Sequence, residues 1–235
     1  MFTNRLAANP RSCVTTDEGH RTRDPDATRE AVLAAAERLF AEQGFANTSL
    51  RDLSSASGVS HPLIHHHFGS KEGLYLAVKR RLVENYAQRF PSAARAVNRP
   101  LNIGSELRRL MEYIGGNPLL LRLCAWTRLE GDRQVWPGEP DIFDTIRRRI
   151  EISQRRKLIR EDLDPQYLTI MLVGLVFFWL DNREHFAHRF GPDIDDKDYL
   201  RQAIEILERG INITGEDAAA SPCSAADDEA DEAID

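Results

Sequence analysis

The sequence predicts an all-α fold, in which a small N-terminal three-helix domain with a helix-turn-helix precedes a larger C-terminal helical domain. Apolar residues recur at three- and four-residue spacing along most of the chain, which is the spacing of a helix with one buried face. Clusters of Gly, Pro and Asp interrupt these segments, and no strand-period alternation of useful length occurs.

Composition and length are those of an ordinary globular protein. Of the 235 residues, 42% are hydrophobic and 29% are charged, which allows a sizeable core. The three cysteines are scattered, which argues against a disulfide framework and fits a reducing cytoplasm. The N-terminus lacks the apolar stretch of a secretory signal. The longest apolar stretch, Tyr167–Leu180, is shorter than the ~20 residues of a membrane span, so we expect a cytoplasmic protein without a membrane partner.

Charge and periodicity divide the chain into four segments. Residues 1–23 lack periodicity and predict a flexible arm, whereas residues 213–235 hold eight acidic residues and no basic one, which predicts a disordered tail. Between them lie the expected helix-turn-helix domain, 24–90, and the expected C-terminal helical domain, 91–212. The whole chain carries a net charge of −6, but residues 1–90 hold 12 Lys and Arg against 10 Asp and Glu. That segment is the one suited to an anionic partner.

The first helix has clear start and stop signals. Asp24 or Asp26 can cap it, Pro25 suits a first turn, and Gly44 ends it. One buried stripe is predicted for Val32, Leu33, Ala36, Leu39 and Phe40.

A helix-turn-helix follows at about 49–68. Ser49 and Asp52 form a capping box for a short helix, Gly58 breaks that helix, and Ser60 can cap the next one. Two short helices joined by a turn of three or four residues with a Gly are typical of this motif.

The rest of the chain is also predicted to be helical. Ser70 can cap a fourth helix from about Lys71 to Gln88. Further helices are predicted near 100–114, 118–130, 140–158, 165–188 and 197–211.

The third helix, His61–Phe68, presents an unusual polar surface. At 100° per residue, Ile64 and Phe68 face the first helix. The rest of the surface holds His61, Pro62, Leu63, His65, His66 and His67. Imidazoles can donate or accept at phosphates and base edges, and the second helix of a helix-turn-helix enters the DNA major groove.

A metal site is the alternative interpretation of these histidines. His61 and His65, four residues apart on a helix, could hold one zinc ion. A zinc site requires three or four ligands, however, and no Cys lies nearby in the sequence. The three adjacent histidines also fan around the helix, so we expect no metal.

Several motifs between residues 26 and 85 fall in register: A-A-x-x-L-F-x-x-x-G, T-S-x-R-D-L, G-V-S, an H-F pair and G-S-K-E-x-L. Together they resemble the N-terminal domain of the TetR/AcrR family of bacterial transcriptional regulators. The resemblance implies an all-α homodimer without a cofactor, whose recognition helix enters the major groove of an operator. It also implies a C-terminal domain that binds a small ligand, which would release the repressor from double-stranded DNA.

The resemblance carries over to individual positions. It implies phosphate contacts from Thr48, Ser49, Ser60, His65, His67 and Lys71, and base-edge contacts from Arg51, His61, Pro62 and Leu63. For Thr48, Ser49 and Ser60, helix capping alone is the other interpretation.

This recognition helix departs from the family pattern in its charge. His61 stands where the family often has Lys or Arg, and His65 where it usually has Tyr. Between Arg51 and Lys71 there is no Lys or Arg, so the helix should be electrostatically weak near pH 7. We hypothesise two compensations: arginines 21, 23 and 29 reach the DNA backbone or minor groove, and the histidines gain protons on the DNA. For the arm, the alternative is a disordered leader that has no role.

The C-terminal domain is expected to hold the ligand pocket and the dimer interface. The resemblance implies that its last two long helices pair across a two-fold axis, and the interface candidates are Leu172, Leu175, Val176 and Trp179. Candidate liners for a small apolar or amphipathic ligand are Met111, Cys124, Trp126 and Phe178. Packing within the monomer is the alternative for both sets. The helix from Lys71 links the two domains, so a ligand that tilts it would change the spacing of the recognition helices.

Two other functions compete with a ligand-responsive regulator. A helical metal-dependent enzyme would use His61 and His65, but the sequence has no third ligand there and no nucleophile motif such as G-x-S-x-G. A non-specific architectural DNA-binding protein would not need a dedicated helical domain of this size. We therefore expect a regulator and not an enzyme.

Overall fold

The computed structural model describes residues 24–91 and 97–212, and every regular element in them is an α-helix. The helices are α1 (Pro25–Gln43), α2 (Leu50–Ser57), α3 (His61–Phe68), α4 (Lys71–Arg89), α6 (Ile103–Gly115), α7 (Pro118–Leu129), α8 (Glu139–Arg155), α9 (Pro165–Phe190) and α10 (Asp196–Ile211). The all-α prediction is confirmed. The expected arm and acidic tail lie outside the described residues.

Capping residues fix the ends of the first helices as predicted. Asp24 accepts a hydrogen bond from the backbone N–H of Asp26 at 3.0 Å and caps α1. Ser49 and Asp52 form the reciprocal capping box of α2, which satisfies two backbone N–H groups that the helix leaves open. Gly58 ends α2 in the left-handed conformation, with φ of 66°.

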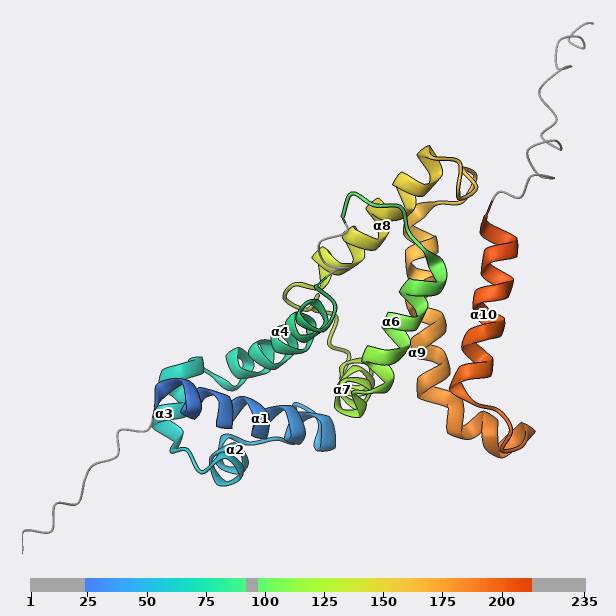
Figure 1. Cartoon of the computed structure of the whole chain (residues 1–235). Coiled ribbons are helices and arrows are strands. Elements are labelled where there is room, and N and C mark those ends of the chain that lie inside the picture. Colours follow the sequence, from blue (N-terminus) through green and yellow to red (C-terminus); the bar gives the residue numbers. More distant parts are fainter. Residues whose placement is uncertain (1–23, 92–96, 213–235) are drawn as a thin grey trace, which may run out of the picture.

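Helices α1, α2 and α3 form a small bundle at one end of the molecule, and α4 runs from this bundle toward the second domain (Figure 1). Its core is apolar. Phe40 of α1 meets Tyr75 of α4 edge to face at 5.1 Å, and Leu53 and Ile64 are buried from α2 and α3.

The C-terminal domain is built around α9. Helices α6 and α8 both pack on α9, and α10 packs on α6; α10 lies at the outer edge of the molecule (Figure 1). Leu172, Val176 and Trp179 of α9 are buried in this core. No helix in the described ranges is long and apolar enough to cross a membrane.

The two domains meet where α7 packs on the C-terminal end of α1. Glu130 accepts hydrogen bonds from the backbone N–H groups of Ala46 at 2.9 Å and of Phe45 at 3.3 Å. The Arg122 guanidinium and the Trp126 indole both donate to the Ala41 carbonyl, at 2.9 and 3.2 Å. We call this set of contacts the α1–α7 junction.

A second connection joins α4 to the segment after α7. The Lys79 ammonium is fully buried, pairs with Asp132, and lies 4.4 Å from the centre of the Tyr75 ring. Because a buried ammonium without a partner is strongly destabilising, this ion pair holds α4 against the C-terminal domain.

Gly44 makes the α1–α7 junction sensitive to one added methyl group. Its φ is 82°, and a Cβ there would lie 2.6 Å from Glu130 Oε1 and 2.7 Å from the Trp126 ring. We expect Gly44→Ala to lower the free energy of unfolding by about 2–4 kcal/mol, because backbone strain and a steric clash add. Chemical denaturation monitored by circular dichroism measures the change.

Gly69→Ala is the matched control for backbone strain alone. Gly69 has a φ of 75°, but nothing lies within 4 Å of the position its Cβ would take. It should cost only about 1–2 kcal/mol. Equal losses in the two variants would contradict a tight junction.

Candidate DNA-reading surface and ligand cavity

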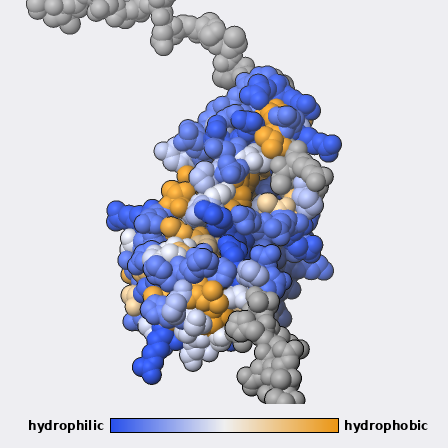
Figure 2. All heavy atoms as spheres, turned by 90° about the vertical axis from the view of Figure 1, so that its left-hand side faces the viewer, coloured by the Kyte–Doolittle hydropathy of each residue, from blue (hydrophilic) through white to orange (hydrophobic). Residues whose placement is uncertain are grey.

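The helix-turn-helix presents a polar surface to solvent. Most of the side chains predicted to contact DNA are exposed: Ser49, Arg51, Ser60, His61, Pro62 and His65. Leu63 and His67 are half-buried, and Ile64 packs inward as predicted. From the side that carries this domain, the surface is mostly hydrophilic (Figure 2). Ser60 is the N-cap of α3, but its hydroxyl makes no hydrogen bond to the helix, so it is available to a phosphate.

Two of the predicted phosphate contacts have a different place in the structure. Thr48 is 1% exposed, and its hydroxyl donates to the Gly44 carbonyl at 2.7 Å. The Lys71 ammonium donates to the carbonyls of Phe45 and Thr48, at 2.9 and 3.0 Å. Thr48 is therefore corrected from a phosphate contact to a buried residue that shapes the α1–α2 turn. Lys71 braces the same turn from α4.

Among the described residues, no group of three or more His, Cys, Asp or Glu side chains is arranged to hold a metal ion. The rings of His66 and His67 lie 5.6 Å apart at 71°, as expected of neighbours that fan around a helix.

One arginine lies beside the end of the recognition helix. The Arg29 guanidinium of α1 sits 5.5 Å from the centre of the Phe68 ring at the end of α3. Arg29 belongs to α1 and not to the arm, and Arg21 and Arg23 lie outside the described residues. Arg29 thus supplies a permanent positive charge next to α3, which has none of its own.

The C-terminal domain contains a cavity of about 340 Å³. Helices α4, α6, α7, α8 and α9 surround it, and apolar and aromatic side chains dominate its wall. Its aromatic liners are Tyr86, Tyr113, Trp136, Phe143 and Phe177. This is the composition and size expected for a small-molecule site.

Among the four predicted liners, the structure places Cys124 in the cavity wall. Burial raises the pKa of its thiol to about 12, so it stays protonated. Met111 is buried in α6 and does not line the cavity, and Trp126 belongs to the α1–α7 junction. Phe178 is 59% exposed on the outer face of α9, whereas its neighbour Phe177 lines the cavity.

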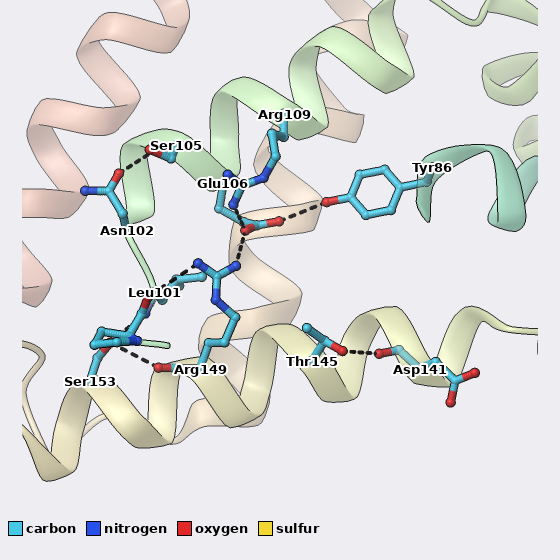
Figure 3. A network of polar contacts seen from close by, with 11 residues as sticks. Tyr86, Leu101, Asn102, Ser105, Glu106, Arg109, Asp141, Thr145, Arg149 and Ser153 are labelled. Carbon is cyan, nitrogen blue, oxygen red and sulfur yellow. Dashed lines mark hydrogen bonds and ion pairs between the residues drawn. The ribbon is translucent and has the colours of Figure 1, made fainter. Parts of the chain in front are cut away.

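A second cavity, of about 220 Å³, adjoins the first: Val83, Tyr86 and Ile142 line both. Tyr86, Glu106 and Arg149 in its wall belong to the polar network of Figure 3, in which Glu106 accepts hydrogen bonds from three side chains. Arg149 donates to it at 2.8 Å, Tyr86 donates through its hydroxyl at 2.9 Å, and Arg109 also pairs with it. No sequence motif predicts this network, because its members come from three separate helices.

The predicted interface residues are corrected as well. Leu172, Val176 and Trp179 are buried inside the protomer, and Leu175 is half-buried, so the first three cannot reach a second copy. A different face of α9 is exposed and apolar, and we call it the outer α9 stripe. It consists of Tyr167, Ile170, Met171, Gly174 and Phe178.

Comparisons with known proteins agree with this architecture. A family model described as bacterial regulatory proteins, tetR family, matches residues 32–78, and one described as Tetracyclin repressor-like, C-terminal domain, matches residues 107–209. The transcriptional repressor NicS of Pseudomonas putida is 23% identical over 204 residues, which cover 82% of this chain and 96% of NicS. The transcriptional regulator RutR of Escherichia coli is 27% identical over 204 residues, covering 82% and 92%.

A solved structure extends the likeness to the fold. GusR of Salmonella enterica superposes with a TM-score of 0.60 at 21% identity, covering 80% of this chain and 97% of GusR. The family models and curated relatives are transcriptional regulators, and none of them supports the enzyme or the architectural alternative. With its capped helix-turn-helix and its helical C-terminal domain, the chain belongs to the TetR family of bacterial regulatory proteins and is a DNA-binding transcriptional regulator.

Proposed function

We propose that the chain is a homodimeric repressor, which binds an operator through α3 and leaves it when a small apolar or amphipathic ligand fills the cavity. It would act in the cytoplasm, where its DNA is. One observation carries the proposal: α7 lines the cavity with Cys124 and Thr127 and contacts α1 with Trp126, and its C-cap Glu130 binds the turn that follows α1. A single helix therefore touches both the ligand site and the DNA-binding domain.

The DNA contacts are proposed from exposure and chemistry. Arg51, His61 and Pro62 are exposed where α2 and α3 begin, and would reach base edges with the half-buried Leu63. Ser49, Ser60, His65 and His67 would contact phosphates, helped by the N-terminal ends of α2 and α3. The Lys71 ammonium donates two of its three N–H groups to carbonyls of the α1–α2 turn, which leaves the third N–H for a phosphate.

The dimer would form through the outer α9 stripe. Tyr167, Ile170, Met171 and Phe178 are each more than half exposed, although they are large and apolar. Their spacing of three, one and seven residues places them on one side of the helix, and Gly174 leaves open space among them. A contiguous apolar face of this kind is typical of a protein–protein interface.

Release would follow from two connections between the domains. A ligand that displaces α7 strains the α1–α7 junction, and one that displaces Trp136 disturbs the segment of Asp132, which holds Lys79 of α4. Both movements change the tilt of the DNA-binding domain. Since two recognition helices must fit successive major grooves about 34–36 Å apart, a small tilt is enough to lose the fit.

Selection from random-sequence duplex DNA tests the repressor function directly. We expect enrichment of a sequence with two-fold symmetric half-sites, because a dimer presents two copies of α3. Binding without sequence enrichment would instead indicate an architectural DNA-binding protein.

The affinity for the selected operator should depend on pH. Contact with phosphates favours protonated imidazole, so the proton is bound at low pH and lost as pH rises. We expect the affinity to fall between pH 6 and pH 8, by up to about tenfold per pH unit for each proton taken up. Fluorescence anisotropy with labelled operator at constant ionic strength measures it.

Two variants identify the groups that cause this dependence. Replacing His61, His65 and His67 together by Gln should flatten the profile, whereas replacing His185 and His188, which are exposed on α9, should leave it unchanged. An affinity that is constant across the range in the unmodified protein would refute the protonation of the recognition helix.

Dimerisation should fail when a charge is placed in the outer α9 stripe. We expect Phe178→Arg to give monomers in sedimentation velocity, because an apolar interface does not accept an unpaired guanidinium, and operator affinity should fall with it. Leu129→Arg is the control, since Leu129 is a large apolar residue that is 76% exposed outside the stripe. A dimeric Phe178→Arg protein would place the interface elsewhere.

A further inference from the structure

The hydroxyl groups around the two cavities share an orientation that constrains the ligand. Four hydroxyl side chains line the cavities, and each one donates its hydrogen to an acceptor inside the protein. Tyr113 donates to the Leu82 carbonyl, Thr127 to the Cys124 carbonyl at 2.7 Å, Thr145 to the Asp141 carbonyl at 2.7 Å, and Tyr86 to Glu106 at 2.9 Å.

The direction of these hydrogen bonds follows from the partners. A carbonyl oxygen has no hydrogen to give, and Glu106 is held between two guanidiniums as a carboxylate, so the hydroxyl must donate in all four cases. Burial raises the pKa of Tyr113 to about 12, and burial and the Glu106 charge raise the pKa of Tyr86. Both phenols therefore keep their protons, and all four hydroxyls offer only lone pairs to a bound molecule.

The charged groups in the cavity walls also favour a ligand that donates hydrogen bonds. Four carboxylates line the two cavities, against two guanidiniums; the carboxylates are Glu84, Glu106, Glu139 and Asp141. Arg128 pairs with Asp181 at 2.8 Å. Arg149 donates to Glu106 and to the Pro100 carbonyl, whereas its Nε is buried without a hydrogen-bond partner. Each guanidinium thus already pairs with a carboxylate of the protein.

Two of the four carboxylates have no such partner. Glu84 of α4 and Asp141 of α8 face the smaller cavity and are exposed at its rim, and neither carboxylate forms an ion pair within the described ranges. Their charge is available to a ligand. The five aromatic rings of the larger cavity also favour a positive charge nearby, through the negative faces of their π systems.

We infer that the ligand is an amphipathic amine, with its aromatic or alkyl body in the larger cavity and its ammonium head in the smaller one. The head would donate to Thr145 and Tyr86 and lie between Asp141 and Glu84. Val83, Tyr86 and Ile142 line both cavities, so one elongated molecule can reach from one to the other. The inference rests on the proposed function, because it names the ligand class of the same sensor site.

A carboxylic acid of the same shape does not suit this site. Its oxygens would face hydroxyl lone pairs and the carboxylates of Glu84 and Asp141. The N–H groups of side chains in the wall of the larger cavity belong to the Trp136 indole and to Arg128, whose guanidinium pairs with Asp181. A neutral alcohol can donate one hydrogen bond, but it lacks the charge. The order of affinity is therefore amine, alcohol, acid.

Three probes with one carbon skeleton test this order: phenylbutylamine, phenylbutanol and phenylbutyrate. Isothermal titration calorimetry on the full-length protein near pH 7 measures each affinity. We expect the amine to bind at least about tenfold more tightly than the alcohol, since charge-assisted hydrogen bonds are about twice as strong as neutral ones, and the acid to bind most weakly.

Variants assign the preference to the smaller cavity. Asp141→Asn and Glu84→Gln should each reduce the affinity for the amine about threefold to tenfold and leave the affinity for the alcohol unchanged. Asp144→Asn is the matched control: Asp144 is also exposed on α8, but it pairs with Arg147 and does not line either cavity. It should leave all three affinities unchanged.

The outcomes separate this inference from the proposed function. If the three probes bind with equal affinity, or the acid binds most tightly, the amine site is refuted while the ligand cavity stands. If the amine is preferred but Asp141→Asn and Glu84→Gln have no effect, the head group lies elsewhere and the assignment is refuted. A protein that binds none of the probes overturns the ligand cavity as well.

Discussion

The contact between Glu130 and the backbone of the α1–α2 turn governs how the two domains work together. Glu130 accepts hydrogen bonds from the backbone N–H groups of Phe45 and Ala46. These residues follow Gly44, where there is no room for a side chain. A carboxylate bound to backbone N–H groups holds the main chain itself, and not only a flexible side chain. The orientation of the helix-turn-helix is therefore set by α7, a helix whose other face lines the cavity.

The same turn is also held from inside the DNA-binding domain. Lys71, at the start of α4, donates to the carbonyls of Phe45 and Thr48, while Glu130 accepts from the N–H groups on the other side of the main chain. Further along α4, Lys79 reaches Asp132, just beyond α7. The turn and α4 thus have two attachments to the C-terminal domain, and under the proposed function a ligand that disturbs either attachment would reorient α3.

Local signals in the sequence were sufficient for the helix-turn-helix and insufficient for the contacts between helices. Asp24, Ser49 and Gly58 act on their own helix ends, so their roles follow from spacing alone. On α9, however, both faces are apolar, and periodicity cannot tell which face meets the core. The result was an interface assigned to buried Leu172 and a cavity assigned to Phe178, one residue away from Phe177. Thr48 was assigned to a phosphate for a related reason: a hydroxyl that suits a phosphate also suits a carbonyl, here that of Gly44.

Because the recognition helix has no permanent charge, more of the free energy of DNA binding must come from well-placed contacts. Since α3 presents imidazoles, a proline and a leucine, the DNA affinity that we propose for it would rest on hydrogen bonds and shape, both of which fall off steeply with misplacement. A helix rich in Lys and Arg would hold DNA loosely over a range of tilts, because Coulomb attraction declines slowly with distance. Here the permanent charges lie outside α3: Arg29 lies at the Phe68 ring, and Arg51 is exposed at the start of α2. Under the proposed function, a small rotation at the α1–α7 junction would therefore be enough to change the affinity for DNA.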